Sequence, residues 1–89
     1  MVKFGTGRRL NPDEITLEIG RRLAKRRREL GLSLSQVADK CGVSLQQIHK
    51  YETGQSVVSA PMLWKLASCL AVPVGYLFGE LELTDKDAK

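Results

Sequence analysis

The chain has 89 residues, of which 14 are Lys or Arg and 10 are Asp or Glu, so its formal net charge is +4. This length suits one small domain with one core, and we expect no small-molecule effector domain beside it. No segment approaches the roughly 18 apolar residues that a membrane span needs, and the charged N-terminus lacks the apolar run of a secretion signal. We therefore expect a cytoplasmic protein without membrane contacts, and its basic charge suits a polyanionic partner.

The first part of the chain predicts an arm followed by a helix. Residues 1–10 contain two glycines, three cations and no periodicity, which is typical of an N-terminal arm. Asn11 and Glu14 have the spacing of a capping box, and Pro12 stands at the first helical position. Gly31 is expected to end this helix. Its apolar stripe comprises Ile15, Ile19, Leu23 and Leu30.

Two further helix starts surround one glycine in the middle of the chain. Ser33 and Gln36 have the spacing of a capping box, in which the serine accepts a backbone N–H and the glutamine reaches back. Ser44 and Gln47 repeat this spacing. Between the two starts, Gly42 can adopt the left-handed conformation that turns one helix sharply into the next. This is the layout of a helix-turn-helix, whose second helix can lie in a DNA major groove.

Two more helices are predicted after this pair. Ser59 has the position of an N-cap, and Pro73 opens a last short helix that Gly79 ends. The four helices after the first are predicted at about residues 34–41, 45–51, 60–70 and 74–78. Because no strand pattern appears, we predict an all-α fold of five helices around one core in a domain of residues 11–79. Residues 80–89, with four acids and two lysines, are expected to form an acidic C-terminal tail.

Groups that could carry out catalysis or hold a metal are sparse in the sequence. His49 is the only histidine, so neither a metal site nor a histidine-based catalytic pair has a second member. Cys41 and Cys69 lie at apolar helical positions without a Cys-x-x-Cys spacing, and we interpret both as small buried hydrophobic residues. We therefore expect no catalytic residue, no metal and no cofactor, and an enzyme is the least favoured class of function.

Taken together, these residues resemble the lambda-repressor-like Cro/CI (XRE) helix-turn-helix family over residues 19–79. The matching positions are Arg27, Gly31-Leu32-Ser33, Val37-Ala38, Gly42-Val43-Ser44, Ile48, Tyr51-Glu52-x-Gly54, Leu66-Ala67, Val72-Pro73-Val74 and Tyr76-Leu77-Phe78. The resemblance implies a bacterial or phage transcriptional regulator, usually dimeric, in which residues 34–53 are the DNA-binding motif.

Two positions depart from the family pattern. The first residue of the second helix, often a glutamine that contacts DNA in relatives, is Leu34 in this chain. We therefore expect backbone amides and the hydroxyls of Ser33 and Ser35 to contact DNA there. Leu45 places an aliphatic side chain at the front of the recognition helix, which favours contact with a thymine methyl group over a hydrogen bond.

One face of the recognition helix carries side chains suited to reading bases. With Leu45 set at 0° on a helical wheel, His49 lies at about 40°, while Gln46 follows at about 100° and Lys50 at about 140°. Gln46 can bond bidentately to adenine, Lys50 can reach guanine or a phosphate, and His49 can do either. The alternative is an ordinary solvated helix face. The expected DNA contacts are Ser33, Ser35, Ser44, Leu45, Gln46, His49, Lys50, Thr53, Gln55 and Arg27.

Six of the eight residues from 21 to 28 are basic, and they divide into different roles. By the resemblance, Arg27 pairs with Glu52, which ties the first helix to the recognition helix while still facing phosphate. Arg26 lies at about 20° from Ile15 on the wheel, inside the apolar stripe, so we expect its stem to pack and its charged head to emerge. The other cations are interpreted as a solvated face from which single members can meet phosphate: Arg21, Arg22, Lys25 and Arg28.

The last two helices carry apolar residues that lie away from the core stripe. Trp64 lies about 200° from Met62 on the wheel, and by the resemblance this region commonly forms the dimer contact. We therefore expect Trp64, Val74 and Tyr76 at a homodimer interface. The alternative is that the tryptophan covers the edge of the core under the arm.

These patterns predict a non-enzymatic, sequence-specific regulator that binds double-stranded DNA as a homodimer. Repression would follow from occupation of an operator that overlaps a promoter, whereas activation would need contact with polymerase. A second hypothesis is an antitoxin-like protein-interaction module in which DNA binding plays a supporting part. Co-purification of a second small protein would favour that hypothesis.

Overall fold

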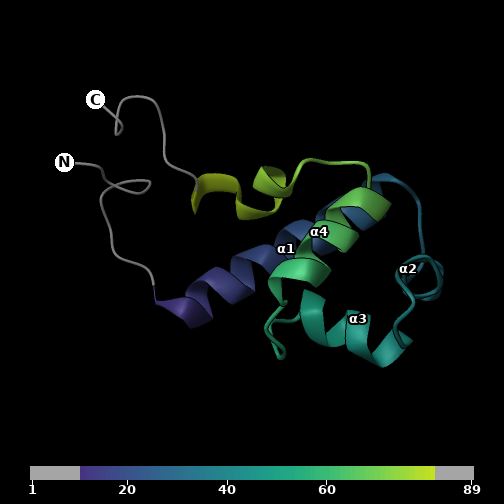
Figure 1. The fold of residues 1–89 in the computed structure, drawn as a ribbon, viewed down its shortest axis with the longest axis horizontal. Helices are drawn as coiled ribbons and strands as arrows, with labels where there is room; N and C mark the ends of the chain where they lie inside the picture. Colours follow the sequence, from purple (N-terminus) through teal and green to yellow (C-terminus); the bar gives the residue numbers. More distant parts are fainter. Residues whose placement is uncertain (1–10, 82–89) are drawn as a thin grey trace.

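The computed structural model describes residues 11–81, and these residues form five helical elements. The elements are α1 (Pro12–Glu29), α2 (Leu34–Cys41), α3 (Leu45–Glu52), α4 (Ala60–Cys69) and the 3-10 helix η1 (Val74–Leu81) (Figure 1). The described residues contain no strand, so the predicted all-α fold is confirmed. The expected arm and residues 82–89 of the expected tail lie outside the described residues. None of the helices described is long and apolar enough to cross a membrane.

Local capping bonds explain why the first two helices begin where they do. The side chain of Asn11 accepts the backbone N–H of Glu14 at 2.9 Å, and the Glu14 carboxylate accepts the N–H of Asn11 at 3.0 Å. Ser33 and Gln36 make the same reciprocal pair at 3.0 and 2.8 Å. At the other end of α2, Gly42 has a φ of 71° in the left-handed region, which turns the chain toward α3.

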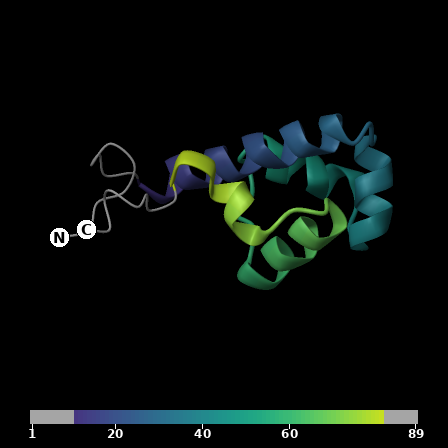
Figure 2. The same cartoon turned by 90° about the horizontal axis from the view of Figure 1, so that it is seen from above.

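The helices pack around a single core, with the long helix α1 along one side (Figure 2). α1 packs against α3 and η1, whereas α2 packs against α3 and α4. The buried hydrophobic residues are Ile19, Leu23, Ala24, Val37, Ala38, Cys41, Ile48, Tyr51, Leu66, Ala67, Leu70 and Leu77. The helix pair α2–α3 is therefore fixed by α1 and α4 through its apolar sides.

Two expectations about burial are wrong. Leu30 is 39% exposed because α1 ends before it; as the C-cap, it donates its backbone N–H to the carbonyl of Arg26 at 3.1 Å. Cys41 is fully buried as expected, but Cys69 is only partly buried. The Cys69 thiol lies 3.5 Å from the carbonyl oxygen of Lys40, at the junction between α4 and α2.

The last helix also differs from its predicted extent. Helical structure runs to Leu81, with an interruption at Gly79, whose φ of 52° and ψ of −122° are not helical. A side chain at Gly79 would overlap the guanidinium of Arg22. The same guanidinium lies 5.0 Å from the ring centroid of Tyr76, in a cation–π contact. Arg22 therefore connects α1 to η1, and the expectation that it belongs to a solvated face is wrong.

Candidate nucleic-acid interface

The outer face of α3 presents four neighbouring side chains to solvent. Leu45 is 44% exposed, and Gln46, His49 and Lys50 are also exposed. The opposite face of the same helix is anchored in the core, where Ile48 and Tyr51 are buried. The two faces are separated as the helical wheel predicts, so the buried pair fixes the orientation of the exposed one.

The N-termini of α2 and α3 carry serine caps with exposed hydroxyl groups. The Ser33 oxygen accepts the N–H of Gln36 at 3.0 Å, and the Ser44 oxygen accepts the N–H of Gln47 at 3.1 Å. Because each hydroxyl is an acceptor in its cap, its own proton can still be donated to an anion. Ser35 is exposed in the first turn of α2, where the helix dipole also favours negative charge.

The capping box predicted at the start of α3 is wrong in one half. Ser44 makes its bond to the backbone of Gln47, but the structure has no return bond from the Gln47 side chain. That side chain is half-buried, near the boundary of the core face. The backbone N–H of Ser44 therefore has no side-chain cap of the kind that Gln36 gives to Ser33.

The loop after α3 is folded back on the end of the helix. The carbonyl of Lys50 accepts the backbone N–H groups of Gln55 at 2.9 Å and Ser56 at 3.2 Å. Thr53 donates its hydroxyl proton to the carbonyl of His49 at 2.9 Å, so this proton is not available to a phosphate while that bond is made. Gln55 is exposed. Of the two expected contacts in this region, Gln55 has the freer side chain.

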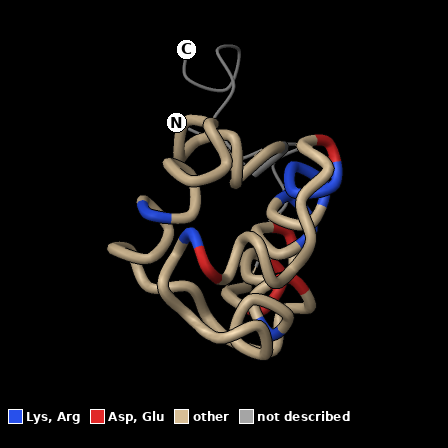
Figure 3. The backbone as a smooth tube through the Cα atoms, turned by 90° about the vertical axis from the view of Figure 1, so that its right-hand side faces the viewer, with Lys and Arg blue, Asp and Glu red and all other residues tan. Residues whose placement is uncertain are grey.

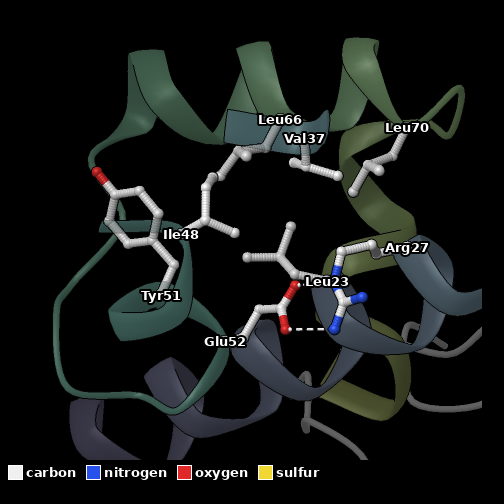
Figure 4. Close-up of a pocket in the computed structure, with 8 residues that line it drawn as sticks. All are labelled: Leu23, Arg27, Val37, Ile48, Tyr51, Glu52, Leu66 and Leu70. Atoms are coloured by element: carbon white, nitrogen blue, oxygen red, sulfur yellow. Dashed lines mark hydrogen bonds and ion pairs between the residues drawn. The ribbon is translucent and has the colours of Figure 1, made fainter. Parts of the chain in front are cut away.

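Arg27 and Glu52 form a bidentate ion pair between α1 and the end of α3 (Figure 4). The two N–H···O distances are 2.7 and 3.0 Å, and the third bonded nitrogen of Arg27 donates to the carbonyl of Leu32 at 3.0 Å. The side chains are only 14% and 8% exposed, and the hydrogen bond that Arg27 donates to Glu52 raises the pKa of Arg27 against the opposing effect of burial. Little of Arg27 is left to meet a phosphate, so the geometry favours a positioning role.

A glycine in the middle of α1 makes the contact with α3 possible, and sequence reasoning missed it. Gly20 is buried, and a Cβ placed there would lie 2.7 Å from the carbonyl oxygen of Glu52 and closer still to that of Tyr51. The signal was present, because an unexplained glycine inside a helix often marks a close approach of another backbone. Gly20 thus sets how near the end of α3 comes to α1.

Figure 3 marks the Lys and Arg positions along the backbone. Those of the basic run of α1 divide between residues with internal contacts and residues that are exposed. Arg26 is half-buried, as expected from its place in the apolar stripe, and its Nε donates to the carbonyl of Leu70 at 2.9 Å. Arg21 bonds the carboxylate of Glu18 at 2.5 Å. Lys25 and Arg28 are exposed. The backbone carbonyl of Arg28 accepts the N–H of Gly31 at 3.0 Å, in the turn that ends α1.

The residues expected at a dimer interface differ in how accessible they are. Trp64 is 66% exposed on α4. Val74 and Tyr76 are only partly exposed, and the Tyr76 ring already contacts Arg22. In this chain, Trp64 is therefore the accessible member of the set.

Proteins similar to this chain in sequence and in structure include transcriptional regulators. A helix-turn-helix family model matches residues 23–77. A Rhodospirillum rubrum protein, named as an uncharacterized transcriptional regulator in the ATPase CF(0) region, is 42% identical over 71 residues, which are 80% of this chain and 66% of that protein. The cryptic phage CTXphi transcriptional repressor RstR from Vibrio cholerae is 33% identical over 63 residues, covering 71% of this chain and 56% of RstR.

A solved structure with the same fold is that of the restriction-modification controller protein C.AhdI from Aeromonas hydrophila. It matches with a TM-score of 0.68 at 32% identity, covering 71% of this chain and 96% of that one. The chain spans about half to two thirds of the length of the curated relatives named above and of others that it matches. The matched segment contains α2, the turn at Gly42, α3 and the Arg27–Glu52 pair. The chain belongs to the helix-turn-helix family.

Proposed function

We propose that this chain is a sequence-specific DNA-binding transcriptional regulator that lays α3 in the major groove. The observation that carries the proposal is the division of α3 between a buried face and a polar exposed face. Base edges are read by side chains that project from a rigid helix into the groove. The serine caps at the starts of α2 and α3 add hydroxyl groups and helix N-termini that suit phosphates.

The exposed side chains of α3 have distinct parts in this proposal. Gln46 pairs bidentately with an adenine, and Lys50 meets a guanine or a phosphate. His49 lies between them and bonds either type of group. Leu45 packs against a thymine methyl group, which suits its 44% exposed aliphatic side chain. Ser33, Ser35, Ser44, Thr53 and Gln55 serve the DNA backbone, with Thr53 through its oxygen or its methyl group.

The regulator acts as a homodimer, because one recognition helix reads too few base pairs to single out a genomic site. A two-fold axis near Trp64, Val74 and Tyr76 would present two copies of α3 about 34–36 Å apart, matching inverted half-sites one helical turn apart. The exposure of Trp64 supports this placement. Repression follows when the occupied operator overlaps a promoter, and the name of RstR as a repressor supports this sign.

A matched pair of lysine variants tests the proposed groove contact. Lys50→Ala removes an exposed lysine from α3, and Lys65→Ala removes an exposed lysine from α4. Both variants lose one positive charge, so they change the net charge equally. Binding sites would be selected from random duplex DNA, and affinities for the best site would be measured at one stated salt concentration. We expect Lys50→Ala to weaken binding far more than Lys65→Ala; equal losses would contradict the placement of α3 in the groove.

The dimer is tested separately through operator geometry. Inserting about five base pairs between the half-sites turns one of them to the opposite face of the duplex. A dimer then loses most of its affinity, whereas a monomer on one half-site is unaffected. Sedimentation of Trp64→Ala, with Val57→Ala as the control at another exposed apolar position, shows whether Trp64 holds the dimer together.

A further inference from the structure

The two cysteines of the chain lie together where the C-terminal ends of α2 and α4 meet. Cys41 is the last residue of α2 and Cys69 is the last residue of α4. The Cys69 sulfur lies 3.5 Å from the carbonyl oxygen of Lys40, the residue immediately before Cys41. Since Lys40 and Cys41 are adjacent in the chain, the Cys69 thiol lies beside the end of α2 that carries Cys41. Neither cysteine is among the residues proposed to contact DNA.

The surroundings of the two thiols differ in a way that suits stepwise oxidation. Cys41 is fully buried, whereas Cys69 is partly accessible. Burial, followed by the hydrogen bond with Cys69, raises the pKa of Cys41 well above its usual range, so Cys41 stays a thiol at neutral pH. The positive charges of Lys65 and Lys40 lower the pKa of Cys41 and so partly oppose this rise.

The geometry points to a redox modification site in which a hydroperoxide oxidises Cys69 and Cys41 then closes an intramolecular disulfide between α4 and α2. In the first step the Cys69 sulfur attacks one peroxide oxygen, the O–O bond breaks and one water leaves, which gives a sulfenic acid. In the second step the Cys41 sulfur attacks the Cys69 sulfur, the S–O bond breaks and a second water leaves with the Cys41 proton. Two thiols and one hydrogen peroxide thus give one disulfide and two waters.

The cross-link would act on the element that carries the recognition helix. A disulfide requires Cα atoms about 4.4–6.8 Å apart. Its S–S distance of about 2.05 Å is shorter than a non-bonded contact between two thiols. Closing it would pull the end of α2 against α4. Gly42, the left-handed turn residue that leads into α3, follows Cys41 directly. The oxidised chain would therefore have its turn tied to α4.

Peptide mapping of the full chain tests the site. The folded protein would be treated with hydrogen peroxide, unfolded, blocked with N-ethylmaleimide and digested with trypsin. Cleavage after Lys40, Lys50, Lys65 and Lys86 places Cys41 in the peptide 41–50 and Cys69 in the peptide 66–86. We expect these two peptides to be joined in monomeric protein, to separate on reduction, and to join at a rate independent of protein concentration.

The control variant Cys69→Ser should leave Cys41 unoxidised and fully alkylated after unfolding, because the accessible thiol that reacts first is missing. Two outcomes would overturn the proposal. One is wild-type protein in which the peptide 66–86 carries a sulfinic acid or a maleimide while the peptide 41–50 is alkylated alone. The other is covalent dimers joined through Cys69 in place of the internal cross-link.

Discussion

The two faces of α3 differ in what their side chains are bonded to. At the junction with α1, Glu52 is held by Arg27 in a bidentate pair, and Gly20 lets the helix backbones touch. On the outer face, Gln46 and Lys50 are exposed to solvent. A side chain whose polar groups are already satisfied within the fold sets position, and one whose groups are free can recognise a ligand. One eight-residue helix thus combines a side that is bonded to the rest of the fold with a polar side that is open to solvent.

The largest expected effect separates the two faces by their response to salt. A dimer that neutralises about six to ten phosphates should lose roughly 10³ to 10⁵ in DNA affinity between about 50 and 200 mM salt. The free energy of unfolding should change little over the same range, because the Arg27–Glu52 pair is mostly shielded from solvent and buried pairs are weakly screened. Binding and chemical denaturation would be measured in the same buffers. DNA affinity that stays flat would show that the outer face does not bind phosphates.

The next largest effect is a loss of stability on breaking the Arg27–Glu52 pair that holds α3 against α1. Glu52→Ala leaves the Arg27 guanidinium without its counter-ion at a part-buried junction, so we expect a loss of about 3 kcal/mol of stability, the lower end of the cost of breaking a buried pair. Arg27→Ala should cost a similar amount, since it strands the carboxylate. Urea denaturation of both single variants and of the double variant gives the coupling energy. Additive losses in this cycle would mean that the pair does not hold the helices together.

A smaller loss of stability is expected from adding a side chain at Gly20, where α1 and α3 approach each other closely. Gly20→Ala in an ordinary helix would gain up to about 1 kcal/mol. In this chain the added methyl group meets the carbonyl oxygens of Tyr51 and Glu52, so we expect a loss of about 1–3 kcal/mol, as for other overpacked sites. Gly31→Ala is the matched control. A methyl group at Gly31 has open space around it, so the only expected loss of stability comes from the strain of alanine at a φ of 70°. If thermal unfolding shows Gly20→Ala to be stabilised, the helices do not touch there.

The sequence predicted the features that depend on local signals. The caps at Asn11 and Ser33 and the turn at Gly42 follow from residues within one helical turn, and the structure has all three. The burial of Ile48 opposite Gln46 follows from the helical period alone. The pairing of Arg27 with Glu52 was expected from the family resemblance, since the two residues are far apart in the chain.

What the sequence did not predict depends on contacts between distant segments. A helical wheel gives direction but not depth, so it placed Leu30 in the core although the helix had already ended. It likewise could not show that Cys69 meets the end of α2, or that Arg22 lies over Tyr76. Gln47 had the right spacing for a cap, but its side chain is partly buried at the edge of the core. Packing geometry overrides spacing in each of these cases.

Base recognition by the exposed face of α3 is tested by Gln46→Ala, which leaves the Arg27–Glu52 pair in place. Gln46→Ala should lose about 1–3 kcal/mol of binding energy on the best operator and relax the preference at one base pair in each half-site. Stability should be unchanged, because Gln46 is exposed. Selection from random DNA, run in parallel with the parent chain, reveals the changed position. If the selected motif were unaltered, Gln46 would not read a base, and base recognition would have to come from another side chain of α3.

The smallest expected effect is a change in DNA affinity that distinguishes Arg28, a proposed phosphate contact, from Arg27 beside it, which positions α3. Arg28 is exposed in the last turn of α1, so its guanidinium is available to a phosphate, whereas that of Arg27 is bonded to Glu52 and Leu32. Arg28→Ala should weaken binding to all sequences about equally and reduce the slope of log K against log salt by about 1 per subunit. Its stability should stay within about 0.5 kcal/mol of the parent, as for most surface changes. Lys25→Ala, which removes another exposed cation of this run, is the control with equal charge. A change in the selected motif on Arg28→Ala would instead make Arg28 a base reader, and an unchanged salt slope would remove it from the interface.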